Sequence, residues 1–238
     1  MTRPEQQSLT HDVRTIAVRT HGRYLVDAHA GAVATLVGFH GYQESAAIHL
    51  DVLRRIARSL PTEAPGAKVG VVTLISIQAL NRFYTRANAV VAGWMTTEDR
   101  ELAMADNIAY TGAVLAAVAA DAGLARPLIY VGFSQGVAMA YRAAAFVPRP
   151  CDGVIALAGD VPPDVVPVAA GLPPILLGRG TEDAWYSAEK MTADAATLRA
   201  ADVPVAEHVF TGGHVWEESF IARARAFLAE RVAATIAR

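Results

Sequence analysis

Three short segments of the chain carry side chains that could serve as a serine nucleophile, a general base and an orienting acid. The first is Gly132-Phe133-Ser134-Gln135-Gly136, which matches the pattern G-x-S-x-G. It follows an apolar run and opens a helical one, the setting in which a tight turn lifts a serine hydroxyl above a sheet. Serine is also a favoured helix N-cap, but an N-cap does not require glycine on both sides. We therefore predict that Ser134 is a nucleophile.

The general base should be a histidine in a late loop. The chain has seven histidines, and His214 is the one that follows two glycines, Gly212 and Gly213, between a predicted strand and the last predicted helix. A surface histidine at a turn is the alternative interpretation. Because His214 comes after Ser134, as in one known chain order of serine catalytic triads, the sequence favours it as the base. His40, after an early strand, is expected to form structural hydrogen bonds.

The third member of such a triad is a carboxylate that holds the imidazole in one tautomer and stabilises its charged form. Asp183 follows the predicted strand Pro174–Gly178 and lies between the serine and the histidine in the chain. Glu182 is the near competitor, because glutamate can serve in this role, and Asp160 is a weaker one. An exposed carboxylate is the alternative for each, and we prefer it for Glu182. The prediction is therefore Asp183.

Acyl transfer also needs fixed hydrogen-bond donors for the developing oxyanion, and such donors change rates by about 10²–10³-fold. One donor should be the backbone N–H of Gln135, directly after the nucleophile. The second should come from the loop after the strand Ala34–Phe39, where Gly41 allows a sharp turn. Glycine is also unremarkable in an ordinary strand-to-helix turn. We expect the N–H of Tyr42 to be the second donor.

The rest of the chain alternates between predicted strands and helices that would bring these groups to one edge of a sheet. Alternation requires crossover connections, so we predict an α/β fold with a mostly parallel sheet of about eight strands and helices on both faces. An opening pair of strands without a helix suggests an antiparallel edge, and residues 1–238 are expected to form a single domain. The predicted strands are Thr15–Arg19, Arg23–Asp27, Ala34–Phe39, Val69–Ile75, Leu128–Phe133, Gly153–Ala158, Pro174–Gly178 and Val205–Phe210. The predicted helices are Ala46–Leu60, Glu98–Ala122, Gln135–Phe146, Ser187–Ala201 and Glu217–Ile236.

A substrate pocket is expected from segments beside the predicted triad. Asp160–Leu172 is rich in proline and has no helical period, which leaves no room for a large cap domain there. Ser76–Thr97 has no clean period and carries large side chains, so it is the best candidate for a pocket wall. For each aromatic residue, packing in the core or in a loop is about as well supported as contact with a substrate. The predicted substrate-binding residues are Phe83, Trp94, Trp185 and Trp216.

Composition and charge argue against several classes of function. Hydrophobic residues make up 53% of the chain and charged residues 18%, so a sizeable core can be buried. The formal net charge is −2 and no basic run stands out, which argues against a nucleic-acid partner. The single cysteine, Cys151, cannot form an internal disulfide, and no Cys/His pair has the spacing of metal ligands. No phosphate-binding or dinucleotide-binding pattern is present, so we expect neither a cofactor nor a metal.

The apolar runs bear on the location of the protein. Met1–Arg14 is polar and lacks the apolar core of a signal peptide. The most apolar helical run, around Gly112–Ala120, is shorter than the ~20 residues that a membrane span needs. These features predict a cytoplasmic protein without a membrane span, and they leave its oligomeric state open.

With these motifs in order, the chain resembles the phospholipase/carboxylesterase family, which includes acyl-protein thioesterases and small bacterial carboxylesterases. The resemblance rests on His40-Gly41, on the segment Gly132–Gly136, on Gly180–Asp183 and on Gly212–His214. It implies a compact α/β-hydrolase fold and the hydrolysis of carboxylic esters or thioesters without a cofactor. The predicted triad adds an acyl-enzyme intermediate on Ser134, and the absence of a cap domain favours small or medium soluble esters.

The chain departs from the family pattern in the loops around the predicted acid and base. Arg179 stands where the family usually has histidine, Ala184–Ser187 replaces a Val-Pro-type segment, and Val215 replaces a common acidic residue. Because these loops help to shape the pocket, the resemblance does not identify the natural substrate. A serine peptidase or amidase, a non-catalytic ligand-binding protein and acyl transfer to an acceptor other than water stay open as alternatives.

Overall fold

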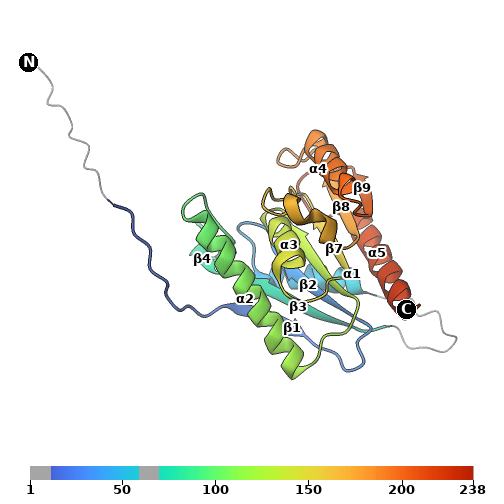
Figure 1. The fold of residues 1–238 in the computed structure, drawn as a ribbon, viewed down its shortest axis with the longest axis horizontal. Helices are drawn as coiled ribbons and strands as arrows, with labels where there is room; N and C mark the ends of the chain where they lie inside the picture. Colours follow the sequence, from blue (N-terminus) through green and yellow to red (C-terminus); the bar gives the residue numbers. More distant parts are fainter. Residues whose placement is uncertain (1–11, 59–69, 238) are drawn as a thin grey trace, which may run out of the picture.

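A mostly parallel β-sheet forms the centre of the protein (Figure 1). The computed structural model describes residues 12–58 and 70–237. Within them the sheet has seven strands: β1 (Arg23–Asp27), β2 (Ala34–Phe39), β3 (Val72–Gln78), β6 (Leu128–Phe133), β7 (Gly153–Leu157), β8 (Ile175–Gly180) and β9 (Val205–Phe210). Their order is β1-β3-β2-β6-β7-β8-β9. The edge strand β1 runs antiparallel to β3, and all other neighbours in this sheet are parallel.

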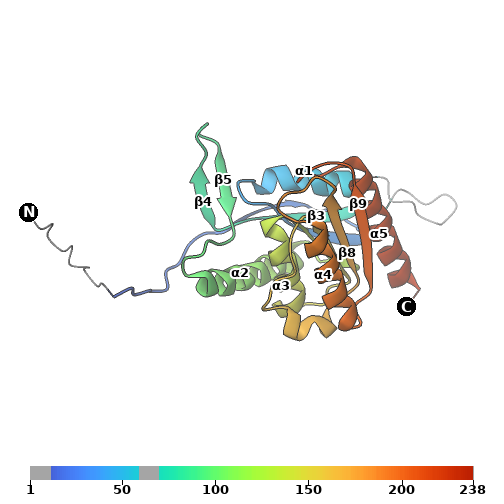
Figure 2. The same ribbon diagram turned by 90° about the horizontal axis from the view of Figure 1, so that it is seen from above.

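Helices cover both faces of this sheet (Figure 2). α1 (Ala46–Ala57) and α5 (Glu218–Ile236) pack on one face, while α2 (Arg100–Asp121), α3 (Gln135–Phe146) and α4 (Ala188–Ala200) pack on the other. Neighbouring residues of β2 show this division, because Leu36 joins the apolar cluster under α1 and α5, whereas Val37 joins the cluster under α2, α3 and α4. Burial on both faces explains why this strand is a continuous apolar run. The predicted mostly parallel sheet with helices on both faces is confirmed.

The first predicted strand, residues 15–19, is wrong. Its apolar side chains Ile16 and Val18 are exposed, and no strand of the described chain pairs with this segment. Alternating apolar residues resemble a strand, but a strand needs a partner to satisfy its backbone groups. The antiparallel edge is therefore β1 alone, and the sheet has seven strands where about eight were predicted.

The segment 76–97, for which no element was predicted, holds the end of β3 and a hairpin of β4 (Asn81–Tyr84) and β5 (Val90–Gly93). Figure 2 shows this hairpin standing out from the sheet. An isolated antiparallel bridge joins Ala92 of β5 to Glu44 in the loop after β2. β4 was missed because three of its four residues are exposed, so it lacks a strand's apolar face.

Several element boundaries differ from the predictions. Two predicted boundaries, at Leu60 and Val69, lie outside the described residues, and β3 starts at Val72. A short 3₁₀ helix, η1 (Val166–Gly171), lies in the proline-rich segment after β7. The described part of the chain has no large cap domain, as predicted.

The helix α2 corrects the expectation about apolar helical runs. It has 22 residues, and among the described residues it is the one helix long and apolar enough to cross a membrane by length and composition alone. Core helices of soluble proteins meet the same criterion. Here one face of α2 packs against the rest of the fold through Val114, Leu115 and Val118.

Parallel strands bring the loops of the predicted site to one edge of the sheet. β2 and β6 end side by side, with Phe39 opposite Gly132, and β8 and β9 likewise end with Gly180 opposite Phe210. The loops that follow these four strands therefore emerge at the same carboxyl edge. This edge is where open α/β sheets place their ligand sites.

Candidate active site

Ser134 occupies a strained turn between β6 and α3. Its φ is 51° and its ψ is −120°, a conformation that costs about 1–3 kcal/mol for a residue with a side chain. The turn is held by two backbone hydrogen bonds: Ser134 N–H donates to Leu157 O at 2.9 Å, and Val137 N–H donates to Ser134 O at 3.0 Å. The prediction of a tight strand-to-helix turn at this residue agrees with these dihedral angles.

The glycines around Ser134 lie where no other residue fits. A Cβ on Gly136 would stand 2.0 Å from the carbonyl oxygen of Phe39, and one on Gly132 would stand 2.6 Å from Val137 Cα. Gly159, after β7, approaches the Ser134 carbonyl oxygen just as closely, at 2.5 Å from its would-be Cβ. Backbone atoms surround the turn on several sides, so the position of the Ser134 hydroxyl group is closely constrained.

Asp183 and His214 form a direct pair in the loops after β8 and β9. His214 Nδ1 lies 2.9 Å from Asp183 Oδ2, and the Asp183 side chain is fully buried. The other carboxylate oxygen, Oδ1, accepts the backbone N–H groups of Trp185 and Tyr186, each at 2.9 Å. A carboxylate can only accept at Oδ2, so we assign the proton to Nδ1 of His214, which leaves Nε2 free to accept.

The two loops that carry Asp183 and His214 are joined through their backbones. A Cβ on Gly180 would lie 2.2 Å from the carbonyl oxygen of Gly212, so only glycine permits this approach. Glu182 N–H donates to the same Gly212 oxygen at 2.8 Å. The Glu182 side chain is exposed, and the sequence alternative that used it as the acid finds no support in this geometry.

Ser134 and His214 line one cavity of about 760 Å³. Hydrophobic side chains form much of its wall, while Arg100, Asp160 and Lys190 bring charge to it. The hydrophobic side chains include Met95, Ala138, Ala158, Val161, Pro162, Pro163 and Trp185. Asp160 and Lys190 form an ion pair at 3.2 Å. No hydrogen bond joins Ser134 and His214 among the described residues. Such contacts are often long in unliganded enzymes and tighten when substrate binds.

The loop after β2 faces the same cavity through Tyr42. Neither the N–H of Tyr42 nor that of Gln135 donates a hydrogen bond within the described chain, so both are available to a ligand. Glu44 closes the turn by accepting the Gly41 N–H at 2.7 Å, and burial raises the pKa of Glu44. His40 is fully buried, its Nε2 lies 3.1 Å from Ala79 N, and burial lowers its pKa.

Of the four predicted substrate-binding residues, the structure brings one to this cavity. Trp185 lines it and is 77% exposed. Trp94 is fully buried and its Nε1–H donates to the His40 carbonyl oxygen at 2.8 Å, so it is a core residue. Phe83 packs on the ring of Tyr42 and Trp216 packs on Phe133, both outside the cavity lining. Sequence reasoning could not distinguish packing from pocket lining for these rings.

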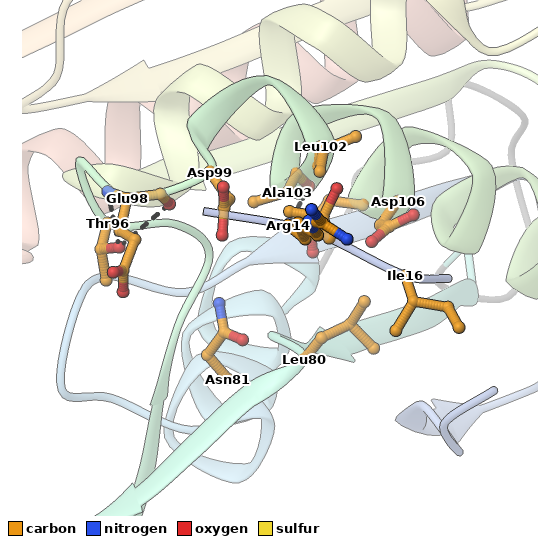
Figure 3. A pocket seen from close by; sticks show the side chains of 12 residues that line it. Arg14, Ile16, Leu80, Asn81, Thr96, Glu98, Asp99, Leu102, Ala103 and Asp106 are labelled. Carbon is orange, nitrogen blue, oxygen red and sulfur yellow. Dashed lines mark hydrogen bonds between the residues drawn. The ribbon is translucent and has the colours of Figure 1, made fainter. Parts of the chain in front are cut away.

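The remaining chemistry-bearing groups lie elsewhere. No cluster of three or more His, Cys, Asp or Glu residues in the described part of the chain could hold a metal ion. Cys151 is a free cysteine whose thiol pKa is raised to about 12 by desolvation. A second cavity, of about 560 Å³, lies between residues 14–16 and the start of α2 (Figure 3). Glu98, Asp99 and Asp106 line it, and it shares no lining residue with the cavity of Ser134.

The sheet order, the strand-to-helix turn at Ser134 and the loops at the carboxyl edge define an α/β-hydrolase. The sequence pattern of the phospholipase/carboxylesterase family matches residues 95–232, and the chain belongs to this family of esterase- and thioesterase-type hydrolases. No curated protein matches the chain significantly.

Solved structures have the same fold. Esterase PE8 is 25% identical and superimposes with a TM-score of 0.67, covering 88% of this chain and 98% of its own. A carboxylesterase from Mesorhizobium loti shares the fold with a TM-score of 0.68 at 17% identity, covering 87% of this chain and 94% of its own. Acyl-protein thioesterase 2 from Zea mays does so with a TM-score of 0.63 at 18% identity, covering 89% of this chain and all of its own.

Proposed function

We propose that the protein is a serine hydrolase that cleaves carboxylic esters or thioesters through an acyl-enzyme on Ser134. The main support is the Asp183–His214 pair, in which His214 Nδ1 lies 2.9 Å from Asp183 Oδ2. His214 lines the same cavity as Ser134, which lies in a strained turn. These are the three groups that covalent acyl transfer requires, in the chain order serine, acid, histidine.

The reaction proceeds in two steps. His214 Nε2 takes the proton of the Ser134 hydroxyl as its oxygen attacks the substrate carbonyl carbon, and Asp183 stabilises the imidazolium that forms. The tetrahedral oxyanion is held by the N–H groups of Tyr42 and Gln135. When the carbonyl re-forms, the bond to the leaving alcohol or thiol breaks and His214 donates the proton to it. Water then repeats the sequence on the acyl-enzyme and releases the acid and free Ser134.

The cavity supports an ester or thioester of small or medium size as the substrate. Its hydrophobic wall, which includes Met95 and Val161, suits an acyl chain, and no large cap domain encloses it within the described residues. The mechanism uses no metal and no organic cofactor. We propose one domain as the functional unit, because strands of one sheet lead to all three groups. We propose the cytoplasm as the compartment, because a single cysteine cannot form the internal disulfides that many secreted proteins use.

The test is hydrolysis of p-nitrophenyl esters of increasing acyl length by the wild-type protein and by Ser134→Ala. We expect the wild type to release nitrophenolate and the variant to be inactive while its circular dichroism spectrum and melting temperature stay close to those of the wild type. Equal turnover by both proteins would show that Ser134 is not the nucleophile.

A fluorophosphonate probe separates the enzyme from a non-catalytic binding protein. The probe forms a covalent bond with an activated serine, so it should label the wild type and leave Ser134→Ala unlabelled. Absence of labelling together with absence of ester turnover would favour a ligand-binding role for the cavity. Turnover of p-nitroanilides at rates comparable to the esters would instead favour the amidase alternative.

A further inference from the structure

The side chain of Gln135 makes two hydrogen bonds that the reaction itself does not use. Its Oε1 accepts the backbone N–H of Trp94 at 2.8 Å, and its Nε2–H donates to the carbonyl oxygen of Met95 at 2.8 Å. Both contacts reach across to the segment directly after β5. The amide of this side chain therefore ties the Ser134 turn to the β4–β5 hairpin.

The same hairpin also holds the loop that carries Tyr42. Gln43 N–H donates to Ala92 O at 3.1 Å, and Ala92 N–H donates to Glu44 O at 2.9 Å. Two residues further on, Trp94 Nε1–H donates to the His40 carbonyl oxygen at 2.8 Å. The loop is thus fastened to β5 and its continuation on both sides of Tyr42.

Between these two attachments lies Gly93, which is close to the side chains of both Tyr42 and Gln135. A Cβ at this position would stand 2.9 Å from Cδ2 of the Tyr42 ring and 3.4 Å from Gln135 Oε1. The segment 92–95 as a whole therefore contacts both the loop of Tyr42 and Gln135, the residue after the nucleophile. Within the described chain, the backbone N–H groups of Tyr42 and Gln135 donate no hydrogen bond.

We infer that Gln135 and the 92–95 segment are positioning elements that set the spacing between the N–H groups of Tyr42 and Gln135. This inference rests on the proposed function, because it concerns the oxyanion site of that reaction. An oxyanion site works only if both donors are fixed about 2.7–3.1 Å from the place where charge develops. Tyr42 and Gln135 belong to different loops, so an element that binds both loops helps to fix the distance between their N–H groups.

The main test is Gln135→Met, which keeps the length of the side chain and removes both hydrogen bonds to the hairpin. The backbone N–H of residue 135 stays in place, so the donor is misplaced rather than lost. We expect kcat to fall by about 10–100-fold, less than the 10²–10³-fold typical of losing a donor, while KM changes by less than about 3-fold. Affinity for a trifluoromethyl ketone, which forms a tetrahedral oxyanion on Ser134, should fall by the same factor as kcat/KM.

A control for general destabilisation is Leu198→Ala in α4. Leu198 is a fully buried core residue that does not line the cavity of Ser134, and its truncation should lower the melting temperature without changing kcat per folded molecule. A merely structural role for Gln135 would give this same result. Gly93→Ala is the second variant, and we expect it to lower kcat with little change in KM because its Cβ would crowd the ring of Tyr42 at 2.9 Å.

The outcomes separate this inference from the function on which it rests. Unchanged kcat in folded Gln135→Met, or a rise in KM alone, would overturn the positioning role. The serine mechanism would still hold in that case if Ser134→Ala were inactive. Full activity of Ser134→Ala would overturn both. A selective loss of kcat and of ketone affinity in Gln135→Met and Gly93→Ala, absent from Leu198→Ala, would support the inference.

Discussion

Replacement of Asp183 by asparagine tests the proposed triad most directly, because the structure predicts how the new side chain will orient. Asp183 Oδ1 accepts two backbone N–H groups, from Trp185 and Tyr186. The oxygen of an asparagine can keep both bonds only if its NH₂ group points at Nδ1 of His214. That nitrogen must then accept, so the proton moves to Nε2, which can no longer take the proton of Ser134.

The expected loss is about 10⁴-fold in kcat, which corresponds to about 5.5 kcal/mol of transition-state stabilisation. Fold stability should change far less, because both backbone hydrogen bonds persist. The assay is p-nitrophenyl ester hydrolysis, with urea unfolding of the same samples. Glu182→Gln is the matched control: its side chain is exposed, and we expect activity within about 2-fold of the wild type. An asparagine variant that kept a tenth of the activity, or an equal loss in Glu182→Gln, would refute the assignment of Asp183.

Two further predictions concern stability. Arg142 is fully buried and donates two hydrogen bonds, of 2.8 and 2.7 Å, to the carboxylate of Asp164, which lower the pKa of Asp164. Asp164→Asn leaves that guanidinium without its charge partner, so the free energy of unfolding should fall by about 3 kcal/mol. The measurement is urea unfolding at pH 7. An unchanged unfolding midpoint would contradict this account. Burial lowers the pKa of His49 to about 3. Below about pH 6.5 the unfolded chain therefore binds a proton on His49 that the folded protein does not bind. The free energy of unfolding should fall as the pH drops from 6.5 towards 3, by about 2 kcal/mol at pH 5. His49→Gln should reduce this acid sensitivity by about that amount, while the buried His40 retains its own share. Equal acid sensitivity of the variant and the wild type would show that the folded protein protonates His49 as readily as the unfolded chain does, which would contradict the lowered pKa.

The parts of the fold that sequence patterns predicted well are those governed by local chemistry. β6 and α3 have the predicted boundaries, because a continuous apolar run, a glycine-flanked serine and a helical period follow one another without a gap. The predicted acid and base were placed in loops after neighbouring parallel strands, and the structure brings these two side chains within 2.9 Å. Topology alone predicts that proximity, since parallel neighbours end at the same edge.

The parts that could not be predicted depend on contacts between distant segments. The β4–β5 hairpin has short strands with mixed burial, and β5 is fastened to the loop after β2 by Ala92, about fifty residues from its partner Glu44. Trp94 looked like a pocket residue because aromatic side chains serve both purposes. Trp94 packs in the apolar core, where His40, Gln135 and Asn107 satisfy its polar groups through hydrogen bonds, and no local pattern indicates these partners.

The two halves of the proposed site therefore depend on different features of the fold. The pairing of Asp183 with His214 follows from the carboxyl edge of the sheet and from Gly180, which lets the two loops touch. The relative placement of the Tyr42 and Gln135 N–H groups involves the hairpin, an element outside the main sheet. Changes in the hairpin can therefore alter transition-state stabilisation while leaving the acid–base pair intact.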